Sequence, residues 1–98
     1  MDKKKLLPIG TVVVLKNSEG RLMISGYFAV KKDEPQHAYD YSGFRFPLGF
    51  VSNEEVFCFD QEQIEHIVQY GFRDYECDGF LENLDNNRDA IKKKVAEG

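Results

Sequence analysis

The side chains that could serve as nucleophile, general base or metal ligand are few and lie far apart along the chain. His37 stands in the polar run "KKDEPQH" and His66 in an acidic segment, and neither pairs with a serine or cysteine in a recognisable catalytic motif. Structural zinc sites usually need four closely spaced Cys or His ligands, which this pattern does not offer. We therefore predict no enzymatic activity, no metal ion and no cofactor.

Three carboxylates alternate at Asp74, Glu76 and Asp78, a spacing that could present oxygen ligands to a cation. A calcium loop of the EF-hand type requires further oxygen ligands, a glycine at its sixth position and a closing glutamate, and this stretch lacks them. Negative charge is favourable at the N-terminus of a helix. We expect these acids to open a helix instead of binding a metal ion.

Cys58 and Cys77 are the only cysteines, and they lack C-x-x-C spacing. Two such residues are more typical of reduced thiols in a cytoplasmic protein than of a disulfide framework. Cys58 stands between Phe57 and Phe59, which predicts that it is buried. No apolar run approaches the roughly 20 residues of a membrane span, and "MDKKKLLPIG" lacks the hydrophobic segment of a signal peptide. We expect a cytoplasmic location without membrane insertion.

The formal charge of −4 is unevenly distributed along the 98 residues. Residues 54–89 contain eleven acidic and two basic residues, a net −9, whereas the segments on either side are basic overall. This balance would repel a nucleic-acid backbone. The acidic block points to a basic or amphipathic protein partner, and the alternative is a solvated face that only maintains solubility.

Aromatic residues crowd the stretch "AYDYSGFRFPLGF", residues 38–50. Because side chains alternate between the two faces of a strand, Tyr39 and Tyr41 share one face, while Phe44 and Phe46 share the other. Two alternatives follow: all of these rings are core of a curved sheet, or the surplus rings form the apolar centre of a protein interface with a charged rim. The predicted protein-binding residues are Phe44, Phe46 and Phe50 at the centre and the acids Glu62, Glu65 and Asp74 at the rim.

Strand-forming patterns predict the elements that must position this stretch. Residues 11–15 and 22–30 are predicted to form a hairpin across the turn "NSEG", with Gly26 at a bulge or sharp bend. Residues 31–37 are charged and contain a proline, which favours a polar loop. Residues 56–59 are predicted to form a further short strand.

The last third of the chain predicts a helical turn, a strand and a helix. Asp60 is a good N-cap with Gln63 three positions later, so one helical turn is expected. The next residues, "EHIVQYGFR", fit a helix or a strand, and we favour the strand. From Tyr75 onwards, apolar residues recur at helical spacing. Because "LDNNRD" has weak helix propensity, we expect this helix to fray, break or restart after Leu84.

These elements predict an α+β fold, in which a small, strongly bent antiparallel sheet or SH3-like half barrel carries one C-terminal helix. The predicted divisions are a single domain over residues 6–84, a basic tail over residues 1–5, and a helical extension or tail over residues 85–98. The predicted core comprises Val12, Val14, Leu22, Ile24, Phe28, Tyr41, Phe57, Phe59, Ile67 and Phe80.

The order of these segments resembles a known family more specifically than any single motif does. "LLPIG", "LMISG", "YDYSGFRFPLG", and "FDQEQI" leading to "GFRD" follow one another with the spacing of domain of unknown function 4176, a small uncharacterised family of Gram-positive bacteria. The similarity covers Leu6 to about Leu84. The loop "KKDEPQHA" is longer than in the family, and the tail after Leu84 has no counterpart, which leaves its role open.

The resemblance implies a link to LXG toxins of type VII secretion, which are encoded beside this family together with small helical partner proteins. Such proteins are expected to be non-enzymatic accessory or targeting factors, chaperone-like in that they bind the toxin in the cytoplasm before export. No catalytic residue is carried over from the family. Two alternatives stay open: an immunity protein that neutralises a toxin domain, and a small nucleic-acid-binding barrel that uses Arg45.

Overall fold

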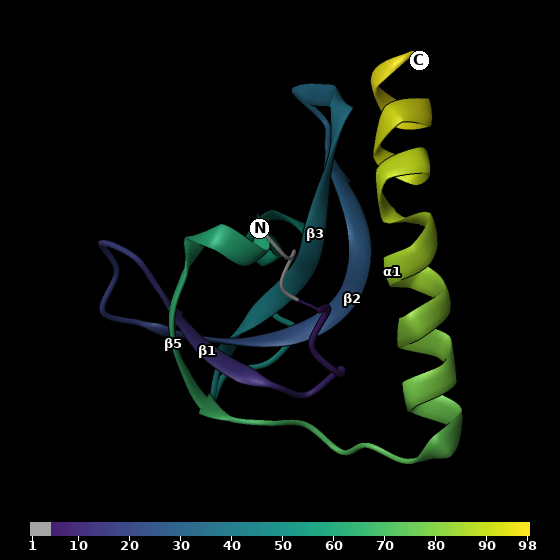
Figure 1. Ribbon diagram of the computed structural model, residues 1–98. Helices are drawn as coiled ribbons and strands as arrows, with labels where there is room; N and C mark the ends of the chain where they lie inside the picture. The colour runs from purple at the N-terminus through teal and green to yellow at the C-terminus, as the bar shows by residue number, and fades with distance from the viewer. Residues whose placement is uncertain (1–4) are drawn as a thin grey trace.

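The computed structural model describes residues 5–98, which form one five-stranded antiparallel sheet and one long helix (Figure 1). The elements are β1 (Val12–Leu15), β2 (Arg21–Lys31), β3 (Glu34–Phe46), β4 (Phe57–Phe59), β5 (Ile64–Gln69) and α1 (Tyr75–Ala96). The strand order is β4-β3-β2-β1-β5, so β4 and β5 form the two edges and the sheet is not closed into a barrel. Helix α1 runs alongside the long β2–β3 hairpin. The predicted α+β class is confirmed.

β1 and β2 form the predicted hairpin. Val13 lies opposite Leu22, and both side chains are buried, because paired residues of neighbouring strands point to the same face of the sheet. The pairing of β2 with β3 shifts register between Ile24 and Gly26, which is the bulge that the sequence predicts. A bulge bends its strand, and β2 is visibly curved in Figure 1.

The polar run at residues 31–37 belongs mostly to a strand, so the predicted loop is wrong. β3 begins at Glu34, and only residues 32–33 connect it to β2. Backbone pairing and the ion pair between Lys31 and Glu34, at 3.8 Å, extend the hairpin without any apolar side chain. A register shift at Lys31 accommodates Pro35, whose missing N–H would interrupt a regular ladder.

The segment after β4 agrees with the sequence prediction. Asp60 caps the short 3-10 helix η2 (Gln61–Gln63) through a capping box, in which the Asp60 N–H donates to Gln63 Oε1 at 2.8 Å. The chain then enters β5, so the strand is confirmed over the alternative helix. A similar 3-10 helix, η1 (Asn53–Glu55), precedes β4.

Helix α1 is uninterrupted over 22 residues, so the predicted break after Leu84 is wrong. Its N-cap is Asp74, whose carboxylate accepts a backbone N–H of the first turn at 2.8 Å. Glu76 and Asp78 lie in the first turn, where negative charge is favourable. The weak "LDNNRD" stretch stays helical because Arg88 makes buried contacts with the sheet, and these outweigh propensity differences of less than about 1 kcal/mol per residue.

The core lies between the sheet, the N-terminal segment and α1. Half of the predicted core residues are buried, namely Val12, Leu22, Ile24, Tyr41 and Phe59. Sequence reasoning missed four further members of the core cluster, namely Leu6, Leu7, Val13 and Leu81. The N-terminal segment and α1 therefore contribute more of the core than their patterns indicated.

The other half of the predicted core is not buried. Val14, Phe28, Phe57 and Ile67 are only half-buried. Phe80 is 54% exposed, because its neighbour Leu81 is the residue that faces the sheet. Val13 takes the inward position that was assigned to Val14, since successive residues of a strand point to opposite faces. Cys58, which was expected to be buried, is half-buried as well.

Candidate functional site

Phe44, Phe46 and Phe50, the predicted centre of an interface, lie at the end of β3 and in the loop that follows it. The rings of Phe44 and Phe50 meet edge to face, with their centroids 5.6 Å apart. Phe44 is half-buried, whereas Phe46 and Phe50 are exposed. The Arg21 guanidinium lies 5.0 Å from the centre of the Phe46 ring. The alternative in which all of these rings are core therefore does not hold for Phe46 and Phe50.

We call residues 46–51 the apolar loop, because four of its six residues have large, apolar and exposed side chains: Phe46, Leu48, Phe50 and Val51. Leu48 is 65% exposed and Phe50 60%. The turn between them is defined by Gly49, whose N–H donates to Arg45 O at 2.8 Å. Gly49 has a φ of 74°, which favours glycine. This turn presents Leu48 and Phe50 to solvent.

The three predicted rim acids are not gathered around the apolar loop. Glu62 and Glu65 are exposed, in η2 and β5. The strand register places Phe46 level with His66 of β5, three strand spacings or about 14 Å across the sheet, and Glu65 is next to His66. Asp74 is the N-cap of α1, so its carboxylate is already engaged by the helix backbone. An interface role for these acids stays a prediction.

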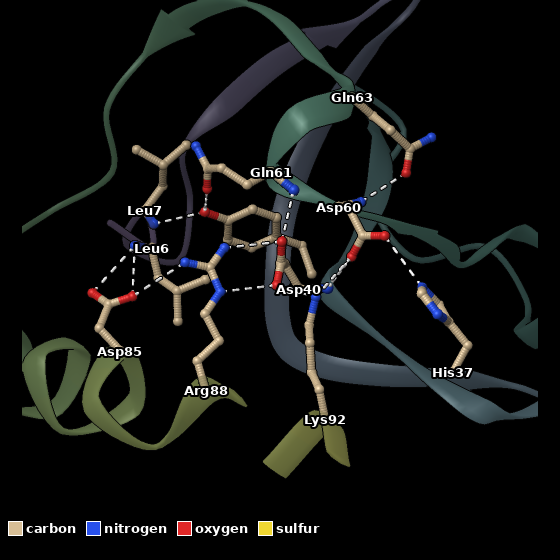
Figure 2. Close-up of polar contacts among 11 residues, drawn as sticks. Leu6, Leu7, His37, Asp40, Asp60, Gln61, Gln63, Asp85, Arg88 and Lys92 are labelled. Carbon is tan, nitrogen blue, oxygen red and sulfur yellow. Dashed lines mark hydrogen bonds and ion pairs between the residues drawn. The ribbon is translucent and has the colours of Figure 1, made fainter. Parts of the chain in front are cut away.

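A buried cluster of charges joins β3 to the second half of α1 (Figure 2). The side chains of Asp40 and Arg88 are only 3% and 8% exposed, and Arg88 Nη2 lies 3.0 Å from Asp40 Oδ2. Lys92 Nζ lies 2.7 Å from Asp40 Oδ1 and 3.3 Å from Asp60 Oδ1. The backbone N–H of Gln61 donates to Asp40 Oδ2 at 2.8 Å. We call Asp40, Asp60, Arg88 and Lys92 the polar network.

The contacts around the polar network also attach the N-terminal segment. Tyr41 Oη accepts the Leu7 N–H at 2.9 Å and donates to Gln61 Oε1. An Asp85 carboxylate oxygen accepts the Leu6 N–H at 3.2 Å, so α1 holds the N-terminal segment directly. Within the described part of the chain, no buried side-chain nitrogen or oxygen lacks a hydrogen-bond partner. The network thus binds together segments from both ends of the sequence.

The charges of the polar network stabilise one another. Burial raises the pKa of Asp40, but the bonds from Arg88, Lys92 and the Gln61 N–H outweigh burial and hold this pKa below its ordinary value. Burial lowers the pKa of Arg88 and of Lys92, yet their bonds to Asp40 raise both above the ordinary values. All three groups are therefore charged at neutral pH. A closed set of paired charges offers no open position to a substrate, so we interpret the network as structural.

A second feature is a groove of about 470 Å³ beside the first turns of α1. We call it the groove, and its lining residues are Ile9, Tyr27, Phe72, Glu76, Cys77 and Phe80. Phe72 is 80% exposed, and Ile9 and Phe80 are more than half exposed. The Tyr27 hydroxyl donates to Leu7 O at 2.6 Å, and burial raises the pKa of Tyr27 to about 12. The groove is therefore mostly apolar, and Glu76 is the one acidic residue that lines it.

The residues first considered for chemistry do not come together. His37 Nε2 lies 3.2 Å from Asp60 Oδ2 at the surface, whereas His66 is exposed on β5. No three His, Cys, Asp or Glu residues within residues 5–98 are grouped in a way that could hold a metal ion. In the same part of the chain, no helix combines the length and the apolar character needed to cross a membrane.

Sequence reasoning missed both the polar network and the groove. Arg88 and Lys92 lie seven and eleven residues after the buried Leu81, which continues one face of the helix. Charges inside the buried stripe of a helix are the signal that could have revealed the network. The groove has no comparable signal, because Ile9 and Phe72 become neighbours only in the folded chain.

A protein-family model described as a domain of unknown function (DUF4176) matches residues 6–80. These residues contain all five strands and every lining residue of the groove, whereas Arg88 and Lys92 lie beyond the matched segment. Comparison with curated proteins and with solved structures finds no match. Because the family model covers well over half of the 98 residues, the chain belongs to the DUF4176 family of domains of unknown function.

Proposed function

We propose that this protein is a non-enzymatic binding protein for a secreted LXG-type toxin of a type VII secretion system. It holds the toxin by protein–protein contact in the cytoplasm before export. The resemblance of the chain's segments to proteins that are encoded beside such toxins supports the proposal. The match to the DUF4176 family model supports the family on which that resemblance rests, and not the toxin association itself. The partners are then the toxin and its small helical co-partners, and neither nucleic acid nor a cofactor takes part.

The observation that carries the proposal is the apolar loop. Side chains such as Leu48 and Phe50 would each gain about 1.5–3 kcal/mol from full burial, yet the fold leaves them in water. Contiguous exposed apolar surface marks interaction sites, and aromatic residues are enriched at the centre of protein interfaces. A partner that covers the loop explains both its composition and its exposure.

The proposal is tested by co-purification of the tagged protein with a neighbouring LXG toxin that is expressed as separate N-terminal and C-terminal halves. Retention of the N-terminal half at physiological salt is the expected result and supports a targeting role. Retention of the C-terminal half alone would instead assign an immunity role. If neither half is retained, the binding proposal is wrong.

The role of the apolar loop is tested in the same assay with the double variant Leu48→Ser, Phe50→Ser. We expect at least a tenfold loss of captured toxin, because two exposed anchors of the interface are removed. The matched control is Val30→Ser with Val68→Ser, which removes exposed apolar side chains from β2 and β5. Equal capture by the loop variant and the control would show that the toxin binds elsewhere.

A further inference from the structure

The walls of the groove are held in place by contacts within the chain. The Gly71 N–H donates to Thr11 Oγ1 at 3.0 Å, and the Thr11 hydroxyl donates to Pro8 O at 2.7 Å. A Cβ at Gly71 would lie 2.1 Å from Ile9 O, so only glycine permits this approach of the β5–α1 connection to the N-terminal loop. Asp74 caps the first turn of α1 and fixes the opposite wall. The groove is therefore pre-formed, which reduces the entropy cost of binding.

The walls expose apolar surface that the fold itself leaves uncovered. Ile9 precedes β1, Phe72 lies between β5 and α1, and Phe80 belongs to α1. All three residues nevertheless line one concave surface. Small-molecule sites typically enclose roughly 70–90% of their ligand. An open groove whose walls are so exposed cannot enclose a ligand to that extent. Its shape suits a larger partner that covers it from outside.

The groove also carries negative charge that its surroundings do not neutralise. Glu76 lines the groove and forms no ion pair with any of residues 5–98. The nearest basic residue in the sequence, Arg73, is paired with Asp78 at 2.8 Å. Residues 70–84 contain four acidic residues and one basic residue, a net −3. Electrostatic complementarity therefore favours a partner that brings Lys or Arg to this edge.

Two backbone N–H groups beside the groove are already bonded within the fold. The Gly10 N–H donates to Ile24 O at 2.9 Å, and the Gly71 N–H is bound by Thr11. Strand addition needs a row of open N–H and C=O groups, whereas helix-in-groove binding needs apolar side-chain walls. Residues one turn apart on a helix project from one face about 5–6 Å apart, which allows two or three of them to enter together. The apolar walls thus match a helix better than an added strand.

From these features we infer that the groove is a docking site for an amphipathic α-helix of the toxin. The helix inserts two or three large apolar side chains and places a Lys or Arg beside Glu76. This inference rests on the proposed function, since the occupant belongs to the proposed complex. Tyr27 lies six residues along β2 from Arg21, which is paired with Phe46, so about 20 Å of the curved strand β2 separates the groove from the apolar loop. The protein therefore has two separate docking surfaces.

The inference is tested by capture of the co-expressed toxin and its co-partners on the tagged full-length protein. Phe72→Ser and Phe80→Ser are each expected to reduce capture at least tenfold, because each removes an exposed wall of the groove. Glu76→Lys is expected to reduce capture more than Glu76→Gln, since it adds repulsion to the loss of an attractive charge. Phe72 lies outside the helix and is largely exposed, so its replacement leaves folding intact.

Two matched controls separate the groove from general surface effects. Tyr75→Ser removes an almost fully exposed aromatic side chain that does not line the groove. Glu19→Lys makes the same charge change as Glu76→Lys in the exposed turn between β1 and β2. Both controls are expected to change capture by less than twofold. A loss in Tyr75→Ser as large as that in Phe72→Ser would overturn the assignment of the contact to the groove.

The remaining outcomes distinguish failure of this inference from failure of the proposed function. Full capture by Phe72→Ser and Phe80→Ser, together with loss in the apolar loop variant, overturns the groove as a docking site and leaves the proposed function intact. No capture by the unaltered protein overturns both. A photo-crosslinking phenylalanine analogue placed at position 72 identifies the occupant. A crosslink to a helical segment of the toxin that carries Lys or Arg supports the inference. A crosslink to a co-partner, to a strand segment or to a small molecule overturns it.

Discussion

The two halves of helix α1 meet the rest of the molecule in opposite ways. The second half contacts the sheet through charges, since Arg88 and Lys92 bind the buried carboxylate of Asp40. The first half buries Leu81 but leaves Phe80 beside the open groove. Charged residues are rarely buried and clustered aromatic residues rarely exposed. The charged contacts are closed and paired, whereas the apolar surface is uncovered.

This difference separates stability from binding along one helix. Buried ion pairs contribute little net stability compared with apolar packing, but removing one partner is costly, so they fix a single arrangement. The polar network can therefore set the position of α1 on the hairpin of β2 and β3, which Figure 1 shows side by side. The groove depends on that position, because α1 provides one of its walls. The variants that follow alter side chains of one region at a time.

The largest expected effect comes from Asp40→Ala, which leaves Arg88 buried without its main partner and the Gln61 N–H without an acceptor. Removing one member of a buried pair typically costs about 3–5 kcal/mol of unfolding free energy. Urea denaturation followed by circular dichroism measures the loss. As a control, Asp40→Leu with Arg88→Met should recover part of the stability, because no unpaired charge of this pair stays buried. A cost below about 1 kcal/mol for Asp40→Ala would show that the network does not hold the helix.

A smaller effect is expected for Tyr41→Phe, which removes the hydroxyl that accepts the Leu7 N–H and contacts Gln61. Because the Leu7 N–H is then buried without a partner, we expect a loss of about 1–3 kcal/mol in unfolding free energy. The matched control is Tyr39→Phe. The Tyr39 hydroxyl donates to Glu34 at the surface, so its removal should lower the unfolding free energy by less than about 0.5 kcal/mol. Equal values for the two variants would mean that the N-terminal segment is not held through Tyr41.

Acidification should weaken the polar network without any substitution. The pKa of Asp40 in the folded protein lies below its ordinary value of 3.8, so its contribution to stability is present above that value and is lost as the pH falls below it. Protonation removes the charge but keeps most hydrogen bonds, so the effect is smaller than that of Asp40→Ala. Urea midpoints measured from pH 7 to pH 3 should fall more steeply for the unaltered protein than for Asp40→Leu with Arg88→Met. Parallel pH profiles would contradict this assignment.

The smallest effect on stability is expected in the groove. Phe72→Ser should change the unfolding free energy by less than about 0.5 kcal/mol, because the side chain is largely exposed and packs on little. The contrasting variant is Leu81→Ala, which truncates a buried side chain of α1 and should cost about 2–5 kcal/mol. Thermal and urea unfolding measure both. A cost for Phe72→Ser similar to that of Leu81→Ala would assign the groove to the core and remove the distinction between the two halves of α1.

The features that the sequence predicts well depend on near neighbours. Four such features depend on residues that are close in the sequence: the β1–β2 hairpin, the bulge at Gly26, the capping box at Asp60 and the choice of strand for β5. The polar loop and the break after Leu84 were wrong because both predictions relied on local propensity alone. Cross-strand pairing within the β2–β3 hairpin outweighs that propensity in the first case, and packing of α1 against a distant residue of β3 outweighs it in the second.

The candidate site divides in the same way. The exposure of Phe46 agrees with the excess of rings on one face of β3, whereas Phe50 lies beyond that strand in the apolar loop. Asp74 shows the limit of this reasoning, because the same acid that suggests a charged rim is also a good helix N-cap. Charge and spacing indicate that an acidic residue makes a specific contact, but they do not distinguish a helix N-cap from a residue at a protein interface.

The sequence by itself determined the antiparallel strands, the terminal helix, the acidic block and the surplus of aromatic residues, because composition and periodicity express these directly. Only the tertiary structure decided which apolar residues are inside, which charges are buried together and where the groove lies. The bonds responsible join Asp40 to Arg88, 48 positions apart, and Leu6 to Asp85, 79 positions apart. No local sequence pattern predicts contacts between residues so far apart, because the burial of a side chain depends on the other segments that pack against it.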